Sequence, residues 1–453
     1  MKKFQIKPAV YFGAGSIQVL DELAYNRVLV ITDPFMVKSG NIKPVMTQLR
    51  TDAQVTVFDH IYPDPDTPLI AEGTEVFIKT DPDLIIACGG GSTIDAAKSI
   101  LYCSGKIAEK EKKRVFVAIP TTSGTGSEVT NFSVIKMDQR KIPVVDDALL
   151  PDLAVLDGDL TKTVPPSITA DTGMDVLTHA LEAYVSTDAS SFSDALAEKA
   201  VEIVFEFLPT AVKHGDDLEA RGFLHDASCM AGMAFTNASL GINHSLAHAI
   251  GGSLHVPHGR ANAILLPWVL GYNAADQRAR QRYGNLAWRL GLSPKNSENG
   301  AEVLQAAVRM LSEAIKIPAS FREAGVNETD FYDNLDRMTM AASGDNCTRT
   351  NPIKPSAEDL RDLYKKSYTG GKEGDEGKNT DSMFGRVPGH ILICFHWICL
   401  CSGHGAENER YKLSIYGSML GRGDYHCDLH CGRCERRSFK SCSYSGIGCM
   451  GWI

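Results

Sequence analysis

Five acidic and histidine side chains near the middle of the chain have the types and spacing of a metal site. Asp175 and His179 are four residues apart, as are His244 and His248, so each pair lies on one face of a helix. His258 follows ten residues later in a Pro-His-Gly turn. One carboxylate and several neutral imidazoles can bind a divalent cation and leave a position open for a substrate oxygen. One such pair alone more often has a structural role, but two pairs together with the Pro-His-Gly motif favour a metal site.

A run of glycines leading from an apolar segment into a helix indicates a phosphate-binding loop. Residues 88–98 read CGGGSTIDAAK, with Gly90, Gly91 and Ser92 at the turn. Glycines let the backbone approach a phosphate, and the N-terminus of the next helix offers free N–H groups with a partial positive charge. We expect Ser92 or Thr93 to cap that helix. The spacing is not G-x-G-x-x-G, so the standard dinucleotide fingerprint is not matched.

A second polar loop follows the next apolar segment. Residues 120–130 read PTTSGTGSEVT and begin with the hydroxyls of Thr121 and Thr122. Hydroxyls and exposed amides suit a diphosphate, although a solvated turn has the same composition. Two such loops, placed side by side in the expected fold, favour a diphosphate.

Asp33 directly follows the apolar segment of residues 27–32. An acid at such a strand end can bind a ribose diol and repel a 2′-phosphate, which favours NAD over NADP. Alternatively, it is an acid at the N-terminus of a helix that begins near Pro34. The sequence leaves both interpretations open.

The elements that position these residues follow two patterns. In the first 160 residues, short apolar runs alternate with segments of helical spacing, such as residues 36–49 and 69–79, which predicts a parallel sheet covered by helices. The expected strands are Arg27–Thr32, Gln54–Phe58, Leu84–Cys88, Val115–Ile119 and Leu153–Leu156. Ligands of such folds bind at the carboxyl ends of the strands. We therefore expect an α/β dinucleotide-binding domain at residues 1–162.

Beyond Pro165-Pro166 the spacing is helical, which predicts an all-α metal-binding domain at residues 163–370. One expected helix runs from Phe192 to Leu208, with Pro209 ending it. The other expected helices are Asp171–Val185, Gly222–Thr236, Ala301–Ile315 and Ser356–Ser367.

Residues 371–453 form an atypical tail that holds eight of the twelve cysteines. One interpretation is a metal-binding appendage that uses Cys427, Cys431 and Cys434. The favoured interpretation is a disordered extension, or an out-of-frame-like segment never selected to pack, because the turn and strand signals that accompany metal sites are missing.

The overall composition excludes several classes of protein. Apolar residues make up 43% and charged residues 22%, as in folded globular proteins. The formal net charge of −9 argues against a broad nucleic-acid surface. Because there is neither a long apolar run nor a secretion signal, we expect a cytoplasmic protein that makes no use of a membrane.

Several motifs in order resemble the iron-containing, or group III, alcohol dehydrogenases over about residues 1–369. The motifs are GGGSTIDAAK, PTTSGTGSEVT, ADTGMDVLTHALEAY, HSLAHAIGGSLHVPHGRANAILLP and NCTRTNPIKPSAEDLRDLY. Within that family the chain is most similar to alkanol dehydrogenases of the 1-propanol or ethanol type. The resemblance implies a dehydroquinate synthase-like architecture, with a cleft between an α/β and a helical domain. The tail matches nothing in the family.

The resemblance also implies a role for individual residues. It gives Asp175, His179, His244 and His258 as ligands of Fe²⁺, with Zn²⁺ as the alternative, and His248 as an active-site histidine near the substrate. It gives Gly90, Gly91, Thr121 and Thr122 as contacts of the NAD phosphates and Asp33 as the ribose-side acid. Lys141 resembles a lysine near the cofactor. Cys347 lies in a motif close to the pocket, where it is equally well interpreted as a buried thiol.

These expectations together indicate reversible hydride transfer between NAD and a short primary alcohol such as 1-propanol or ethanol, or the matching aldehyde. The resemblance further suggests a homodimer and an association with a bacterial microcompartment. Three other functions stay open: a metal- and NAD-dependent lyase of the dehydroquinate synthase type, a glycerol-type polyol dehydrogenase, and a scaffold that uses the Cys-rich tail. The lyase needs basic residues for a phosphorylated substrate, and Arg260 is the one such residue near the histidines.

Overall fold

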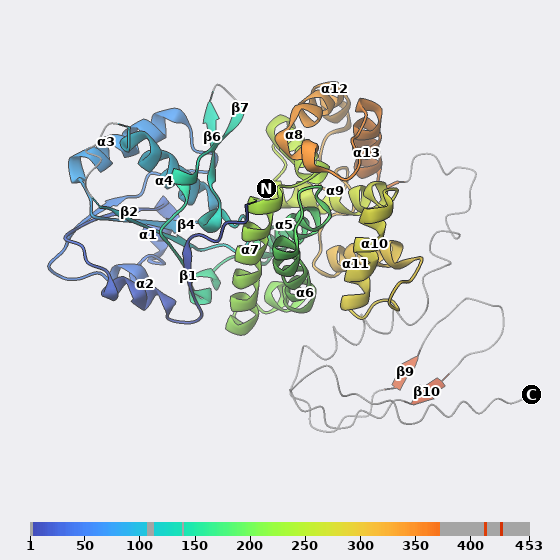
Figure 1. Cartoon of the computed structure of the whole chain (residues 1–453), viewed down its shortest axis with the longest axis horizontal. Helices are drawn as coiled ribbons and strands as arrows, with labels where there is room; N and C mark the ends of the chain where they lie inside the picture. The colour runs from blue at the N-terminus through green and yellow to red at the C-terminus, as the bar shows by residue number, and fades with distance from the viewer. Residues whose placement is uncertain (1–2, 107–112, 138–139, 372–411, 415–425, 429–453) are drawn as a thin grey trace, which may run out of the picture.

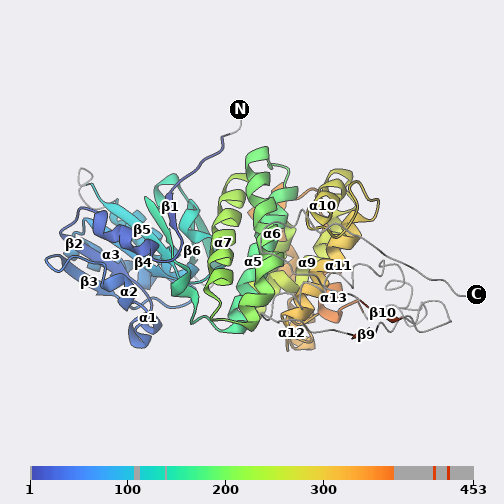
Figure 2. The same ribbon diagram turned by 90° about the horizontal axis from the view of Figure 1, so that it is seen from below.

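The computed structural model describes residues 3–106, 113–137, 140–371, 412–414 and 426–428. Within these ranges the chain forms an α/β half and a helical half that pack side by side (Figure 1, Figure 2). The halves follow one another along the chain, since the last strand of the large sheet precedes the first long helix of the helical half. This arrangement confirms the fold class that the sequence predicts.

The α/β half is built on a six-stranded parallel sheet with the order β1-β8-β5-β4-β2-β3. Its strands are β1 (Ala9–Phe12), β2 (Arg27–Ile31), β3 (Gln54–Phe58), β4 (Leu84–Gly89), β5 (Val115–Pro120) and β8 (Leu153–Leu156). Five of these strands match the predicted ones. The sequence does not predict β1, because it is an edge strand with mostly exposed side chains and lacks a buried apolar run.

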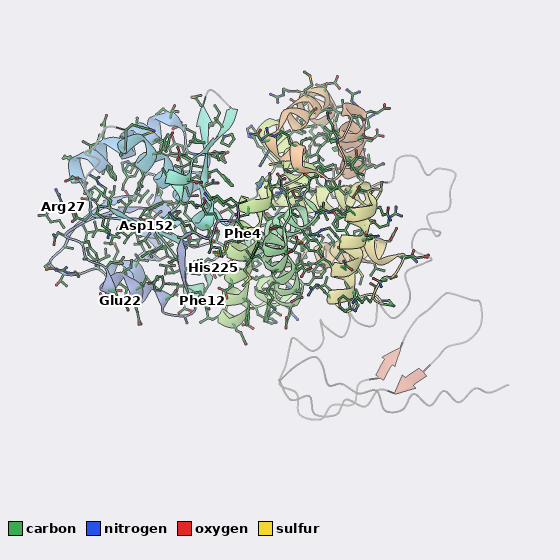
Figure 3. The ribbon with its side chains drawn as sticks, in the orientation of Figure 1. Phe4, Phe12, Glu22, Arg27, Asp152 and His225 are labelled. Carbon is green, nitrogen blue, oxygen red and sulfur yellow. The ribbon has the colours of Figure 1, made fainter. Side chains whose placement is uncertain are left out.

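Helices cover both faces of this sheet, and side chains fill the space between (Figure 3). The helices of this half are α1 (Pro34–Ser39), α2 (Lys43–Met46), α3 (Thr67–Thr80) and α4 (Gly91–Ser104), with the 3₁₀ turns η1 (Ser16–Glu22), η2 (Ser127–Val129), η3 (Asp147–Leu149) and η4 (Gly158–Thr161). Val28 and Val30 point into the core beneath α1 and α2, whereas Leu29 and Ile31 point into the core beneath α3 and α4. Burial on both faces explains why the strands are continuous apolar runs.

Two features of this half differ from the sequence-based expectation. Residues 36–49 have the spacing of one helix, but Gly40 adopts φ 78° and separates α1 from α2. Glycine enters this left-handed conformation without a Cβ clash, so it ends α1. An antiparallel hairpin of β6 (Phe132–Met137) and β7 (Arg140–Val145) also follows the second polar loop, where no strand is expected.

The helical half contains the five predicted helices and four more, α8, α9, α10 and α12, of which α8 carries the predicted helical pair of His244 and His248. Its elements are α5 (Pro166–Val185), α6 (Ser191–Lys213), α7 (Leu218–Ala238), α8 (Ile242–Leu254), α9 (His258–Asn273), α10 (Gln277–Arg289), α11 (Gly300–Ala314), α12 (Glu328–Gly344), η5 (Asn346–Thr350) and α13 (Ala357–Thr369). The prediction that Pro209 ends its helix is wrong, because α6 continues to Lys213. A proline inside a helix costs about 3 kcal/mol, which the burial of Leu208 and Ala211 helps to offset.

The two halves meet where α7 packs against β8, η2 and η4. Val129, Ala154, Leu156 and Cys229 form a small buried cluster at this junction. The backbones approach closely, because a Cβ on Gly126 would lie 2.6 Å from the Cα of Gly232. Tight packing at this point fixes the loops of the sheet relative to the helices.

Most of residues 371–453, including Cys431 and Cys434, lies outside the described residues. The described pieces are two short strands, β9 (Lys412–Ser414) and β10 (His426–Asp428), which pair antiparallel; Cys427 lies in β10. Both interpretations of this tail, the favoured disordered or non-native extension and the metal-binding appendage, therefore concern residues that lie mostly outside the described ranges. None of the helices in the described ranges combines the length and the apolar character needed to cross a bilayer.

Candidate active site

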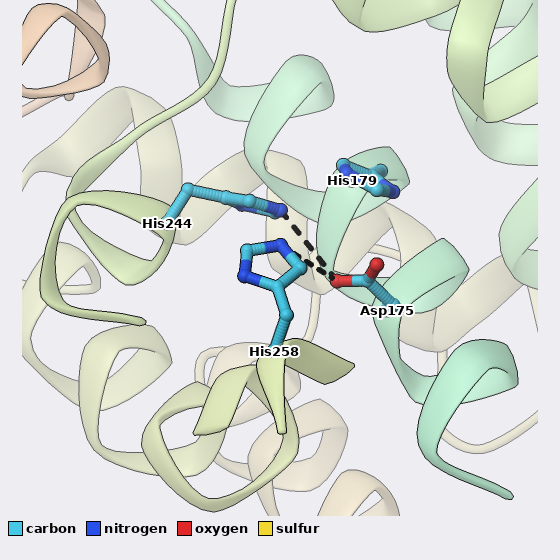
Figure 4. Close-up of side chains that lie close together, drawn as sticks. All are labelled: Asp175, His179, His244 and His258. Atoms are coloured by element: carbon cyan, nitrogen blue, oxygen red, sulfur yellow. Dashed lines mark ion pairs between the residues drawn. The ribbon is translucent and has the colours of Figure 1, made fainter. Parts of the chain in front are cut away.

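Four of the five candidate metal-site residues converge from three helices (Figure 4). Asp175 and His179 come from α5, His244 from α8 and His258 from the first residue of α9. Each offers one ligand atom, and these atoms all lie within 4.8 Å of one another. The Oδ1 atom of Asp175 is 3.7 Å from Nε2 of His244 and 3.5 Å from Nε2 of His258. The sequence spacing therefore identified residues that the fold brings together.

Close packing of α5 and α9 brings Asp175 and His258 together. A Cβ on Gly259 would lie 2.3 Å from the carbonyl oxygen of Asp171, so this contact requires a glycine. One turn before Asp175, the carboxylate of Asp171 accepts two hydrogen bonds from the guanidinium of Arg260, at 3.0 and 3.1 Å. A bidentate pair of this kind fixes orientation as well as distance.

Burial sets the protonation of the two groups on α5. Burial lowers the pKa of His179 to about 3, so its ring is neutral. The ring stacks between Phe235 and His244, and its Nδ1 has no hydrogen-bond partner among the described residues. Burial alone would raise the pKa of Asp175, but the neighbouring rings, His258 first, hold it well below its usual range. A neutral imidazole with an unused nitrogen and an ionised carboxylate suit a cation.

Glu182 orients His244, and the sequence analysis does not identify it. Its Oε2 lies 2.5 Å from Nδ1 of His244, and its Oε1 accepts a hydrogen bond from the Asn243 amide at 2.6 Å. Burial alone would lower the pKa of His244, but the charge of Glu182 and the bond to Asp175 raise it to about 9. A carboxylate on the far nitrogen of a histidine is the usual support of a metal ligand. The missed signal is helical spacing, since Glu182 is seven residues after Asp175.

Asn262 is a second group that the sequence analysis missed, although it is four residues after His258. Its fully buried Nδ2 donates to Oδ1 of Asp175 at 2.6 Å. The same nitrogen lies 3.2 Å from Nε2 of His244 and 3.1 Å from Nε2 of His258. The Asn262 amide thus lies against one ligand atom of each of three candidate metal-site residues.

His248 lies beside this cluster rather than in it. Its ring stacks on His258 with a centroid distance of 5.3 Å, and its side chain is 42% exposed. Its Nδ1 lies 2.9 Å from a carboxylate oxygen of Asp345. Although His244 and His248 share one helix face, only His244 belongs to the group of four. This placement agrees with a role near the substrate.

The two polar loops of the α/β half lie against each other. The amide of Thr121 donates to the carbonyl of Gly89, and a Cβ on Gly90 would lie 3.5 Å from the hydroxyl of Thr122. The expectation that Ser92 or Thr93 caps α4 is wrong, because the N-cap is Gly90, and no side chain caps it. The first amides of α4 therefore keep their capacity to bind an anion.

Asp33 caps α1, which is the alternative that the sequence left open. Its Oδ1 accepts from the Met36 amide at 3.0 Å. The hydroxyl of Thr32 donates to the Cys88 carbonyl at 2.7 Å, so Asp33 follows the strand next to the one that carries the first glycine loop. This position is compatible with contact to a nucleotide, which stays a prediction. Lys141 lies in β7, and its side chain is outside the described residues.

His225 of α7 lies at the junction of the two halves (Figure 3). Its Nδ1 is 3.0 Å from the hydroxyl of Ser123 in the second polar loop. Burial lowers the pKa of His225 to about 4, so the ring is neutral. We interpret it as a structural contact that holds the loop against the helical half.

Comparison with known proteins gives a consistent result. A model described as iron-containing alcohol dehydrogenase matches residues 8–158, and one described as the C-terminal part of the Fe-containing alcohol dehydrogenase family matches residues 169–368. The chain is 43% identical over 370 residues to 1-propanol dehydrogenase PduQ of Citrobacter freundii, covering 81% of this chain and 99% of that one. It is 38% identical over 387 residues to an NADPH-dependent butanol dehydrogenase of Clostridium saccharobutylicum, covering 82% and 99%. The crystal structure of a 1,3-propanediol oxidoreductase is similar with a TM-score of 0.76 and 33% identity, covering 81% of this chain and all of that one.

Proposed function

The chain belongs to the iron-containing alcohol dehydrogenase family, and from this premise we propose that it interconverts short primary alcohols and aldehydes with NAD. Membership makes it an oxidoreductase that acts on alcohols and aldehydes. The finer proposal concerns the size of the alcohol, the choice of NAD and the role of each residue. The observation that carries a metal-dependent activity is the convergence of Asp175, His179, His244 and His258, whose ligand atoms lie within 4.8 Å of one another.

We assign the cation to these four side chains. The unused nitrogen of His179 and the ionised Asp175 fit a divalent ion. A bound divalent ion supplies Lewis acidity, which stabilises negative charge on an oxygen and can lower the pKa of a water from about 15.7 to about 7. The family favours Fe²⁺, whereas ligand chemistry alone favours Zn²⁺, which generally binds such donors more tightly.

We assign the cofactor phosphates to the two loops of the α/β half. The uncapped N-terminus of α4 at Gly90, Gly91 and Ser92, and the hydroxyls of Thr121 and Thr122, provide donors without a side chain in the way. The carboxylate of Asp33 would repel a 2′-phosphate, which supports NAD over NADP. The butanol dehydrogenase relative is described as NADPH-dependent, so this choice needs its own measurement. The role of Lys141 near the cofactor stays a prediction.

We assign His248 to proton transfer. Oxidation of RCH₂OH by NAD⁺ gives RCHO, NADH and H⁺, and the proton of the hydroxyl must reach solvent. The His248 ring touches the metal cluster on one side, and its exposed side chain reaches solvent. Asp345 holds its Nδ1, so the ring presents its other nitrogen in a defined orientation. His248 can therefore accept the hydroxyl proton and pass it to water.

The test is an anaerobic NAD(H) assay with alcohols and aldehydes of two to four carbons. The purified chain is treated with a chelator, assayed, and assayed again after Fe²⁺ or Zn²⁺ is returned. We expect NADH oxidation by propanal to disappear with the metal and to return with it, and NADPH to be used less well. Full activity after complete removal of the metal would contradict the assignment.

The lyase alternative is not favoured. Its phosphorylated substrate needs free basic residues near the cation, but Arg260 forms a bidentate ion pair with Asp171. The similar alcohol dehydrogenases support hydride transfer instead. In a direct assay, we expect the chain to release no phosphate from a sugar phosphate. A glycerol-type polyol dehydrogenase would use the same hydride transfer, so the range of substrates that the chain accepts distinguishes this alternative.

Assembly and location are part of the proposal. We propose a cytoplasmic homodimer without nucleic-acid or membrane partners, consistent with the net charge of −9. Light scattering of the purified chain at several concentrations tests the dimer. Association with a bacterial microcompartment stays a prediction, which co-purification with shell particles would test.

A further inference from the structure

A second group of metal-ligating side chains lies beside the first. His248, Asp345 and Cys347 offer a nitrogen, an oxygen and a sulfur atom that lie within 4.8 Å of one another. His248 comes from α8, and the other two come from the segment that begins η5. None of these three residues belongs to the group formed by Asp175, His179, His244 and His258. We call this second group the outer cluster and the first group the inner cluster.

The outer cluster is held in place by its own contacts. Oδ1 of Asp345 accepts from the Cys347 amide at 2.8 Å and from the Ser245 hydroxyl at 3.4 Å. The other oxygen of Asp345 lies 2.9 Å from Nδ1 of His248. Thr348 in turn donates to the Ser245 hydroxyl at 2.8 Å. The three donor atoms are therefore positioned before any ligand arrives, which lowers the entropic cost of binding one.

Two of the three donors are also accessible, unlike most of the inner cluster, whereas Cys347 is partly buried against the helical core. The side chain of His248 is 42% exposed and that of Asp345 is 21% exposed, whereas those of Asp175 and His244 are 4% and 1% exposed. A cation from solvent can thus reach His248 and Asp345 without opening the helical half.

From these contacts we propose that His248, Asp345 and Cys347 form a second cation site, of the kind that takes Zn²⁺ or Co²⁺. One imidazole, one carboxylate and one thiolate are a usual donor set for Zn²⁺, and a water completes four-coordination. Burial raises the pKa of the Cys347 thiol, so the group is a thiol before the ion arrives. Binding forms the metal–sulfur bond and releases the thiol proton to water.

Occupation of the outer site would inhibit the enzyme, and this consequence rests on the proposed function. An ion bound to Nδ1 takes the nitrogen that Asp345 now holds. The ring could then neither keep its orientation nor accept a proton freely. Activity should therefore fall when the outer site fills, while the inner cluster keeps its metal.

Cobalt distinguishes the two sites, because only the outer cluster contains sulfur. The full-length chain is stripped of metal under anaerobic conditions and titrated with Co²⁺, and absorbance is followed in the near ultraviolet, where thiolate-to-cobalt charge transfer occurs. Wild type is compared with Cys347→Ser and with Asp345→Asn. Asp345→Asn keeps every cysteine, including the eight beyond residue 371, and also serves if Cys347→Ser does not fold. Cys103→Ser, which removes an exposed cysteine elsewhere, is the matched control.

We expect both outer-cluster variants to lose the same charge-transfer absorbance and one equivalent of bound cobalt, and Cys103→Ser to lose neither. A band that persists in Asp345→Asn, or wild-type uptake that equals uptake by both variants, would overturn the proposal. His258→Ala separates this test from the proposed function. It should lose cobalt from the inner cluster but keep the thiolate band. Absence of an inner equivalent in wild type would contradict the proposed function alone.

Discussion

The first glycine loop of the α/β half offers backbone amides for binding, whereas the candidate metal site of the helical half offers side chains. The first turn of α4 exposes its amides because Gly90 and Gly91 carry no Cβ and no side chain caps the helix. The helical half instead brings Asp175, His179, His244 and His258 together from three helices. The glycine loop of the α/β half thus depends on the absence of a Cβ atom at two glycines. The candidate metal site of the helical half depends on the spacing and approach of helices.

This difference determines how each site can fail. A backbone site is damaged by adding a side chain, and the surrounding fold can survive that change. A side-chain site is damaged by removing one donor or by loosening the residue that orients it. Substitutions in the two halves should therefore have separable effects on the cofactor and on the metal.

The largest effect is expected from His258→Ala. Loss of one of four donors should strip the metal and lower kcat on the order of 10³-fold or more, because a Lewis acid supplies several kcal/mol of stabilisation. Metal content by emission spectrometry and kcat with propanal measure this. His248→Ala is the control, since it should keep the metal and lose activity by about 10²- to 10⁴-fold. A His258→Ala protein with full metal-dependent activity would refute the ligand assignment.

Next in size is the pH response of the junction between the halves. His225 is buried with a pKa of about 4, whereas an unfolded histidine titrates near 6.5. The unfolded chain therefore binds the proton more readily, so stability is lost as the pH falls from about 6.5 towards 4. The full loss is on the order of 3 kcal/mol.

Urea unfolding of wild type and His225→Gln at a series of pH values measures this effect. The stability of wild type should fall more steeply on acidification than that of the variant. His60→Gln replaces a histidine of the α/β half whose side chain is 61% exposed, and it serves as the control for the substitution itself. Parallel curves for wild type and His225→Gln would contradict the explanation.

The fold class and the candidate ligand positions could be predicted from the sequence because they depend on local spacing. Buried strands are continuous apolar runs, and acid–histidine pairs four residues apart mark helix faces. Spacing alone cannot separate His244 from His248, since both lie on one face of α8. The bonds from Glu182 of α5 to His244 and to the Asn243 amide hold the start of α8 against α5, so His244 rather than His248 meets Asp175.

Other features could not be predicted, for different reasons. Glu182 and Asn262 stand at helical spacing from Asp175 and His258, but that spacing does not reveal their roles, which arise only when three helices are packed. The local capping rule predicts Ser92 or Thr93 as the cap of α4, but the N-cap is Gly90 and the first amides of the helix stay without a side-chain cap, which a phosphate site would require. Pro209 remains inside α6 because tertiary packing outweighs local propensity.

A smaller effect is expected from Glu182→Gln. The amide of glutamine can donate to Nδ1 of His244, which places the ring proton on Nε2, the nitrogen that faces Asp175. Metal affinity should fall by about 10- to 100-fold, the usual cost of losing such a support, while cofactor binding is unchanged. Competition with a chromophoric chelator measures the affinity. Glu198→Gln, a carboxylate that bonds Tyr184 instead, is the control and should bind metal like wild type.

The smallest effect, and the one that isolates the α/β half, is expected from Gly90→Ala. Its φ of −75° suits alanine, and the new Cβ would make an ordinary contact with Thr122 at 3.5 Å, so the fold should persist. The methyl group would stand where a phosphate approaches the amides of α4. Loss of one hydrogen bond to a charged group costs about 1.5 kcal/mol, so the KM for the cofactor should rise about tenfold. Metal content should equal that of wild type.

The control is Gly222→Ala, which changes a helical glycine of α7 with open space around it. It should change neither the KM for the cofactor nor the metal content. An unchanged KM in Gly90→Ala would remove the first glycine loop from the cofactor site while leaving the metal assignment intact, because the two sites are built from different kinds of atoms.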